Sequence, residues 1–138
     1  MTLSESFDPN FLPDAGVHLA LGITIEQATP ERVVVSVPVT SKVHQPYGIL
    51  HGGVSALLAE SAASIGGAVT APKGKVVVGT ELNCSHLRSM SEGILTATAT
   101  PIRIGRTIQV WGIELTDELG KSICTARCSL AVIERPSA

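Results

Sequence analysis

The first part of the chain alternates between segments rich in β-branched residues and segments rich in turn-forming residues. Residues 22–29 and 31–39 carry the isoleucines and valines typical of strands, and Thr29-Pro30 between them is a turn signal, so the two segments predict a hairpin. Residues 40–50 contain proline and glycine and predict a loop. Residues 1–20 are mixed in character, and we expect an N-terminal extension that is irregular or a short helix.

A different pattern begins at His51. From there to about residue 70 the chain is composed of Ala, Leu, Ser and Gly, without β-branched runs. Apolar residues recur at spacings of four, four, three and four, which is the period of a helix about five turns long. This expected core-facing stripe consists of Val54, Leu58, Ala62, Ile65 and Val69.

Four further strands are predicted after the helix, separated by turn signals. Their expected ranges are 75–86, 94–104, 107–116 and 122–133. No second helix is available as a crossover, so the last four strands are most simply an antiparallel meander. A single apolar helix can be buried only by a sheet that curls round it, and the prediction is one α+β domain spanning residues 1–138.

Composition narrows the classes of function. Charged residues make up 16% of the chain, against about 25% in an average soluble domain, so part of the surface is expected to be covered by self-association. Ten basic against 12 acidic residues and only 3% aromatic residues argue against nucleic-acid binding. The N-terminal residues lack the pattern of a secretory signal, and three cysteines do not suggest a disulfide scaffold, so we expect a cytoplasmic protein.

The helix carries one charged residue in an otherwise uncharged stretch. The 30 residues between Lys42 and Lys73 contain a single formal charge, Glu60. This glutamate and the surrounding serines, threonines and glycines make membrane insertion unfavourable, so no membrane association is expected. A glutamate in mid-helix is ordinarily a solvated surface residue.

The neighbours of Glu60 argue for a covered position instead. The helix face opposite the apolar stripe carries small residues where a solvated face normally carries long polar side chains. These residues are Gly53, Ala56, Glu60, Ser64 and Gly67. We infer that a second chain or a ligand approaches this face closely, and a carboxylate shielded there from water is a stronger base or nucleophile than a surface acid.

The start of the helix is suited to an anionic oxygen. Gly52 and Gly53 leave backbone N–H groups unobstructed at the positive end of the helix dipole, an arrangement typical of an oxyanion hole, although such glycines can also serve only a tight turn. Gln45 has amide donors to direct at the same oxygen. His51 is either a catalytic acid or a residue that holds the loop by a hydrogen bond.

The distance between the two groups predicts how a site could form. Gly52 and Glu60 are eight residues apart, about 12 Å along a helix, so the pair of one chain cannot act on one carbonyl. If both act in one site, Glu60 must meet the Gly52 N–H of a neighbouring copy. The sequence therefore predicts a symmetric dimer with two composite sites.

Several segments together resemble the hotdog-fold acyl-CoA thioesterases, over roughly residues 20–135. They are Gln45-Pro46-Tyr47-Gly48-Ile49-Leu50-His51-Gly52-Gly53, Leu58-Ala59-Glu60-Ser61, Val78-Gly79-Thr80-Glu81-Leu82-Asn83 and His86-Leu87-Arg88-Ser89. The branch that the chain resembles acts on 4-hydroxybenzoyl-CoA or 1,4-dihydroxy-2-naphthoyl-CoA. The resemblance implies a sheet wrapped round a central helix, and dimers that usually pair into tetramers.

The resemblance also implies a role for each matching residue. The Gly52 N–H and the Gln45 side chain hold the thioester carbonyl oxygen, Glu60 is nucleophile or general base, and Ser64 orients the carboxylate or the water. His51 and Gly53 belong to the same site. The residues expected at the nucleotide phosphates of coenzyme A, unless they are simply solvated cations, are His86, Arg88 and Arg106. Coenzyme A is part of the substrate, and no separate cofactor is expected.

Other chemistries find less support. Cys124 and Cys128 lie about 13 Å apart on one expected strand, too far for a shared metal or disulfide, so the three cysteines are expected to fill the core and no metal is implied. A hotdog enoyl-CoA hydratase or dehydratase would need a second acid/base group, which the sequence does not offer. A non-catalytic acyl-CoA-binding protein would have little use for a shielded carboxylate near a helix start.

Overall fold

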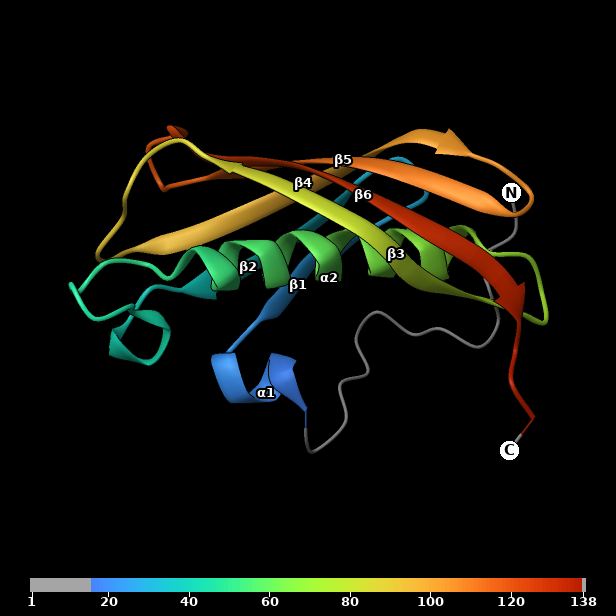
Figure 1. Cartoon of the computed structure of the whole chain (residues 1–138), viewed down its shortest axis with the longest axis horizontal. Coiled ribbons are helices and arrows are strands. Elements are labelled where there is room, and N and C mark those ends of the chain that lie inside the picture. The colour runs from blue at the N-terminus through green and yellow to red at the C-terminus, as the bar shows by residue number, and fades with distance from the viewer. Residues whose placement is uncertain (1–15, 138) are drawn as a thin grey trace.

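A computed structural model describes residues 16–137 and has the helix and strands in the predicted order (Figure 1). The part of the N-terminal extension that it describes contains a short helix, and the rest of the expectation for residues 1–20 lies outside the described residues. The elements are α1 (Val17–Leu21), β1 (Thr24–Ala28), β2 (Val33–Pro38), the 3₁₀ helix η1 (Ser41–Val43), α2 (Gly52–Thr70), β3 (Lys75–His86), β4 (Ile94–Ile104), β5 (Ile108–Thr116) and β6 (Ser122–Glu134).

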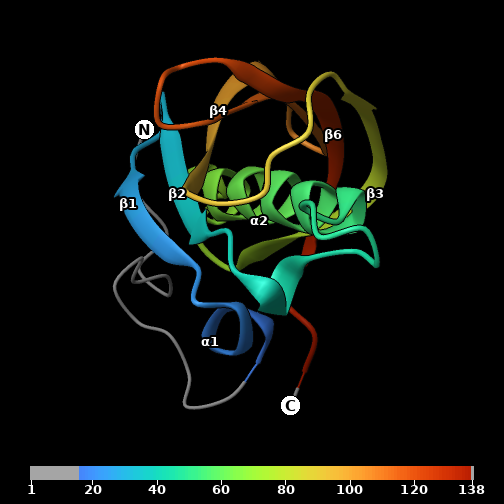
Figure 2. The ribbon, with the colours of Figure 1, turned by 90° about the vertical axis from the view of Figure 1, so that its left-hand side faces the viewer.

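The strand order differs from the expected meander at one strand. The six strands form one antiparallel sheet in the order β1-β2-β4-β5-β6-β3. The meander is correct for β4, β5 and β6 but wrong for β3, which pairs with β6 at the far edge. After α2, the chain forms β3 at the edge of the sheet beside β6. Residues 87–93 then cross the N-terminal end of α2 to reach β4 (Figure 2).

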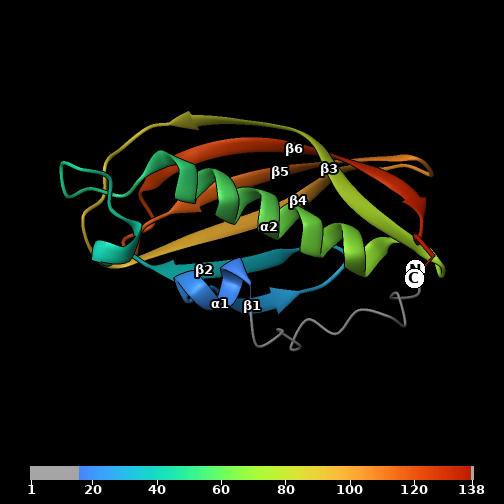
Figure 3. The ribbon, with the colours of Figure 1, turned by 60° about the horizontal axis from the view of Figure 1, so that its bottom comes forward.

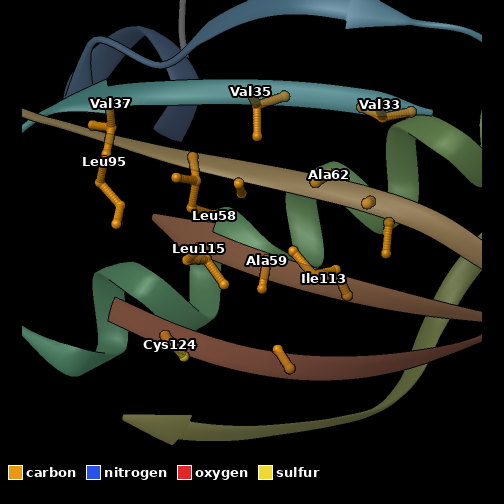
Figure 4. Packing of buried hydrophobic residues seen from close by; sticks show 14 of the residues in the cluster. Val33, Val35, Val37, Leu58, Ala59, Ala62, Leu95, Ile113, Leu115 and Cys124 are labelled. Atoms are coloured by element: carbon orange, nitrogen blue, oxygen red, sulfur yellow. The ribbon is translucent and has the colours of Figure 1, made fainter. Parts of the chain in front are cut away.

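The sheet curls round α2, which packs against the concave face (Figure 3). Of the predicted core stripe, four residues are buried, and Val54 near the helix start is half-buried. Leu58, Ala59 and Ala62 face Val35 of β2 and Ile113 of β5 (Figure 4). By length and composition alone α2 could cross a membrane, and half of it is buried against the rest of this chain.

The small-residue face of α2 is only partly free. Gly53 and Glu60 are exposed and Ser64 is half-buried, which agrees with the prediction that this part of the face is open to a second chain or a ligand. Gly67 is instead buried within the chain, because a methyl group there would lie 2.6–2.7 Å from side-chain atoms of Val77 and Leu130. The expectation that Gly67 belongs to an open face is therefore wrong, since the sheet edge formed by β3 and β6 curls over this end of the helix.

A buried chain of hydrogen bonds ties the second half of α2 to β5. The Trp111 indole Nε1 donates to Gln109 Oε1 and Gln109 Nε2 donates to Thr70 Oγ1, both at 2.9 Å. The Thr70 hydroxyl donates in turn to the carbonyl of Gly66 at 2.9 Å. Every link is buried, so each polar group keeps a partner away from water. The Trp111 ring is thereby fixed over Gly66, where a methyl group would lie 2.5–2.8 Å from three ring carbons.

This close approach predicts that Gly66→Ala destabilises the fold. Alanine favours helix by about 1 kcal/mol over glycine, but overpacking a core typically costs about 1–3 kcal/mol, and the hydrogen-bonded ring cannot move aside. We expect a net loss on the order of 1–2 kcal/mol in the free energy of unfolding, measured by urea denaturation.

Gly112→Ala in β5 is the matched control. A methyl group there would meet only the flexible end of Ile102 at 3.4 Å, so the stability should stay level or rise slightly. Equal stability of the Gly66→Ala variant and the parent would show that Trp111 does not confine this helix.

Candidate active site

A cavity of about 440 Å³ opens at the N-terminal end of α2. It lies between the loop that precedes α2 and the connection from β3 to β4. Gln45, Gly52, His86 and Arg88, four of the predicted site residues, line it together. The structure thus brings together residues that are up to 43 positions apart in the sequence.

Gly52 is the first residue of α2 and presents a free donor. Within the described part of the chain its backbone N–H has no hydrogen-bond partner. The imidazole of His86 lies beside it, because a methyl group on Gly52 would be 3.0 Å from His86 Nε2. Glycine therefore leaves room for both the ring and the approach to the N–H group, at the positive end of the helix.

His51 caps the helix. Its Nδ1 accepts a hydrogen bond from the Gly53 N–H at 2.8 Å, so the neutral ring carries its proton on Nε2. This hydrogen bond agrees with the alternative in which His51 has a structural role, here at the start of the helix. The Gly53 N–H is engaged by this cap, whereas the Gly52 N–H is free for a ligand.

Gln45 is oriented by its own loop. The backbone N–H of Tyr47 donates to Gln45 Oε1, which fixes the side-chain carbonyl within the turn. The backbone N–H of Gln45 donates to the carbonyl of Ile49 at 2.8 Å and closes the loop. With its oxygen engaged, the side chain has its NH₂ group left to donate, and the residue lines the cavity.

Glu60 lies away from this cavity and faces β3. Its side chain is exposed, and a methyl group on Gly79 would lie 2.6 Å from Glu60 Oε1, so the carboxylate rests against the backbone of that strand. The pairing of β3 with β6 shifts between Gly79 and Glu81, which leaves Thr80 as the extra residue of a β-bulge. Within one chain Gly52 lines the cavity and Glu60 lies against β3, so the two residues are apart, as their spacing of eight residues along the helix predicts.

The contact of Gly79 with the carboxylate of Glu60 was not predicted from the sequence. The available signal was a glycine inside a strand pattern, which often marks a bulge or a close approach. Ser55, a buried serine one turn after Gly52 that lines the cavity, was not predicted either. The signal there was the spacing of three, which places both residues on one face of a helix.

Two other predicted residues lie outside the cavity. Ser64 is half-buried one turn beyond Glu60, with no side-chain hydrogen bond inside residues 16–137. Arg106 lies in the turn between β4 and β5, where the Val132 N–H donates to the neighbouring Thr107 carbonyl. Ile123, at the other end of β6, lines the cavity, about 30 Å away along the strand. One chain therefore does not bring Arg106 near His86 and Arg88.

The cysteines form part of the core, as expected for Cys124 and Cys128, while Cys84 is half-buried. Burial raises the pKa of Cys124 to about 12. Burial, with smaller contributions from the charges of Glu60 and Cys84, raises the pKa of Cys128 to about 11. These two thiols are protonated at neutral pH. In the described part of the chain, no group of three or more His, Cys, Asp or Glu residues is placed to hold a metal ion.

Comparisons with known proteins place the chain in a family. The profile of the thioesterase superfamily matches residues 47–124. A 1,4-dihydroxy-2-naphthoyl-CoA hydrolase of Listeria monocytogenes is 49% identical over 117 residues, covering 85% of this chain and 95% of the relative. A proofreading thioesterase of Cronobacter sakazakii is 41% identical over 113 residues, covering 82% of each chain.

Solved structures of thioesterases are also similar to this chain. A thioesterase of Haemophilus influenzae superposes with a TM-score of 0.89 at 39% identity, covering 97% of this chain and 96% of the other. A thioesterase of Pseudomonas aeruginosa, solved as a mutant, superposes with a TM-score of 0.81 at 40% identity, covering 86% of each chain. The chain therefore belongs to the thioesterase superfamily, as its resemblance to the hotdog-fold acyl-CoA thioesterases predicts, and is a thioester hydrolase.

Proposed function

We propose that this protein hydrolyses an aryl-CoA thioester to the free acid and coenzyme A, in a site completed by a second copy of the chain. The observation that carries the proposal is the free Gly52 N–H beside the oriented Gln45 amide at one cavity. The relative that is named for 1,4-dihydroxy-2-naphthoyl-CoA supports an aromatic acyl group. Coenzyme A enters as part of the substrate, and we expect the protein to act in the cytoplasm.

The two donors account for carbonyl activation. As a nucleophile attacks, the thioester carbonyl oxygen gains negative charge, and fixed donors stabilise this oxyanion more than the ground-state carbonyl. The Gly52 N–H adds the favourable potential of the helix start. Because the loop already holds Gln45 Oε1, little reorganisation is needed when the oxyanion forms.

Glu60 supplies the attack in one of two ways. As a nucleophile, its carboxylate forms a mixed anhydride and expels coenzyme A as the thiolate, and water then hydrolyses the anhydride. As a general base, it takes a proton from the water that attacks the carbonyl directly. Ser64, one helical turn on, orients the carboxylate or the water in either route.

A second copy brings the two halves together. Strand β3 is an edge strand of 12 residues, and a long edge with unpaired backbone groups is a ready surface for pairing with another chain. Glu60 lies against this strand and is exposed in a single chain, so a partner seated at this edge would cover the carboxylate. We propose a homodimer with two composite sites, which pairs further into a homotetramer.

The mouth of the cavity suits the phosphates of coenzyme A. His86 and Arg88 are exposed there and provide one imidazole ring and one guanidinium group with N–H donors for phosphate oxygens. Arg106 can join them only from another copy, because it lies at the opposite end of its own chain.

Glu60→Gln should abolish most turnover, by about 100- to 10,000-fold in kcat, since the amide is neither base nor nucleophile. Release of coenzyme A, followed with a thiol-reactive disulfide, gives the rate. Glu31→Gln, an exposed glutamate in the β1–β2 turn, is the matched control and should keep full activity. Turnover of the Glu60→Gln variant within about threefold of the parent would remove Glu60 from the mechanism.

Gln45→Ala should lower kcat by about 10- to 1,000-fold with a smaller change in KM, as expected for a donor whose bond strengthens in the transition state. Gln27→Ala, at an exposed position of β1, serves as the matched control. A change confined to KM would place Gln45 in ground-state binding instead.

Mixing the two weak variants tests the composite site. In a heterodimer of Glu60→Ala and Gln45→Ala subunits, one site carries both defects and the other carries neither. Random exchange makes half of the dimers mixed, so activity should recover to about a quarter of the parent's. If exchange is shown by mass spectrometry and no activity returns, both groups act within one chain and the dimeric site is wrong.

A further inference from the structure

A hollow of about 240 Å³ lies over β3 and β6, on the face of the sheet that points away from α2. Its β3 residues alternate with Leu82 and Cys84, which pack against the core. The outer hollow therefore presents an amide, two hydroxyls and a guanidinium, all of which can donate hydrogen bonds. The residues that line it are Asn83, Ser85, Thr125, Ala126 and Arg127.

Arg127 and the nearby Glu81 are charged residues without a partner in the single chain. Glu81 lies two residues before Asn83 on β3 and therefore faces the same side of the sheet. Both charged side chains are exposed, and within residues 16–137 neither makes an ion pair or a side-chain hydrogen bond. A neighbouring carboxylate, Glu114, accepts a hydrogen bond from the Thr125 hydroxyl at 2.7 Å. One guanidinium and one carboxylate on this face are thus available to another chain.

The proposed composite active site determines how a second copy would pair along β3. In one chain, Gly52 lies beside His86 at the end of β3. Glu60 lies beside Gly79, nearer the middle of the same strand. If Glu60 of one copy meets Gly52 of the other, then Gly79 of one β3 lies opposite His86 of the other β3.

This constraint locates the two-fold axis of the pair. Gly79 is paired with Leu130 and His86 with Cys124, so six ladder positions separate Gly79 from His86 once the bulge is taken into account. The axis passes midway between them, three positions from each, which is at Asn83.

An antiparallel pair of β3 strands centred on Asn83 brings Glu81 of one copy opposite Ser85 of the other. Residues directly opposite in such a pair point to the same face, with Cβ atoms about 5 Å apart, so Glu81 enters the outer hollow of the second copy. Arg127 lies one strand further, with its Cα about 12 Å from that of the entering Glu81. An arginine and a glutamate side chain together span this distance.

We propose that the outer hollow binds the Glu81 carboxylate of a second copy, with Arg127 as its ion-pair partner. This inference rests on the proposed composite site and adds the residues that hold the two copies in register. Symmetry makes the contact twice in each dimer. A slip of two residues would keep every side chain on its face but would move Glu81 away from Ser85, so the ion pair favours the register in which Glu60 meets Gly52.

The test mixes two charge-reversed variants, Glu81→Arg and Arg127→Glu. A homodimer of either variant has like charges at both contacts, whereas the mixed dimer has one parent contact and one reversed contact, both attractive. We expect the mixed dimer to make up about nine-tenths of all dimers, against half for random exchange, because each contact contributes about as much as an exposed ion pair. Native mass spectrometry separates the three species by mass.

Glu31→Arg mixed with Arg32→Glu is the matched control. These two residues are exposed in the β1–β2 turn, at the opposite edge of the sheet from β3, so their mixture should contain the random half of mixed dimers. Since all four substitutions are at exposed positions, each variant should fold as the parent does.

A cysteine scan tests the register without any change of charge. Asn83→Cys places two thiols at the two-fold axis, so oxidised glutathione should convert the variant to a covalent dimer. Ser85→Cys should stay unlinked, because its two thiols would lie on residues about 13 Å apart along the strands. The parent, which carries Cys84, gives the background.

Two outcomes would overturn the proposal. A random mixture from a parent that dimerises would mean that the outer hollow does not bind Glu81 of a second copy, since any pairing within one chain is the same in all dimers. Covalent dimers of Ser85→Cys in place of Asn83→Cys would put the axis elsewhere. A monomeric parent is a separate result, which would overturn the proposed composite site and this inference with it.

Discussion

The close packing of α2 against the curled sheet is the constraint on which the rest of the structure depends. Gly66 lies directly under the Trp111 ring, and Gly67 lies under Val77 and Leu130, so the helix approaches the strands more closely than larger residues allow. The hydrogen bonds from Trp111 through Gln109 to Thr70 hold the ring in this position. A helix enclosed in this way has little surface for charged side chains, which explains why Glu60 is alone on it.

The same enclosure produces the cavity. Because the sheet surrounds α2 along its length, the helix start emerges at one end of the curl, where the connection from β3 to β4 must cross it. The Leu50 N–H donates to the Met90 carbonyl at 2.7 Å and joins the loop before the helix to this connection. The free Gly52 N–H and the His86 ring therefore meet as a consequence of the topology, without a dedicated binding domain.

Local pattern predicted the elements because period and turn chemistry are local properties. Gly52 could be predicted for the same reason, since glycine at a helix start exposes N–H groups whatever the tertiary structure is. Gln45 could be predicted because its amide donors lie close before that helix start in the sequence. The edge position of β3 could not be predicted, because strand pattern does not specify a partner. The separation of Arg106 from the cavity follows from the length of β4, whose two ends carry Arg106 and the β3–β4 connection, and the predicted strand range 94–104 already implied it. The pairing of His51 with Gly53 depends on a rotamer that sequence leaves open.

The placement of Glu60 would link the proposed catalysis to assembly. Water solvates an exposed carboxylate well and weakens it as a base or nucleophile, yet in the single chain Glu60 is exposed beside an edge strand. Nothing within residues 16–137 closes this side of the helix, because the strand next to it pairs on one edge only. A surface laid along β3 would remove water from the carboxylate and, by symmetry, add a second cavity with its own Gly52. In the proposed dimer, covering the edge of β3 and completing the site would be a single step, and the small residues of α2 would serve packing on one side of the helix and the reaction on the other.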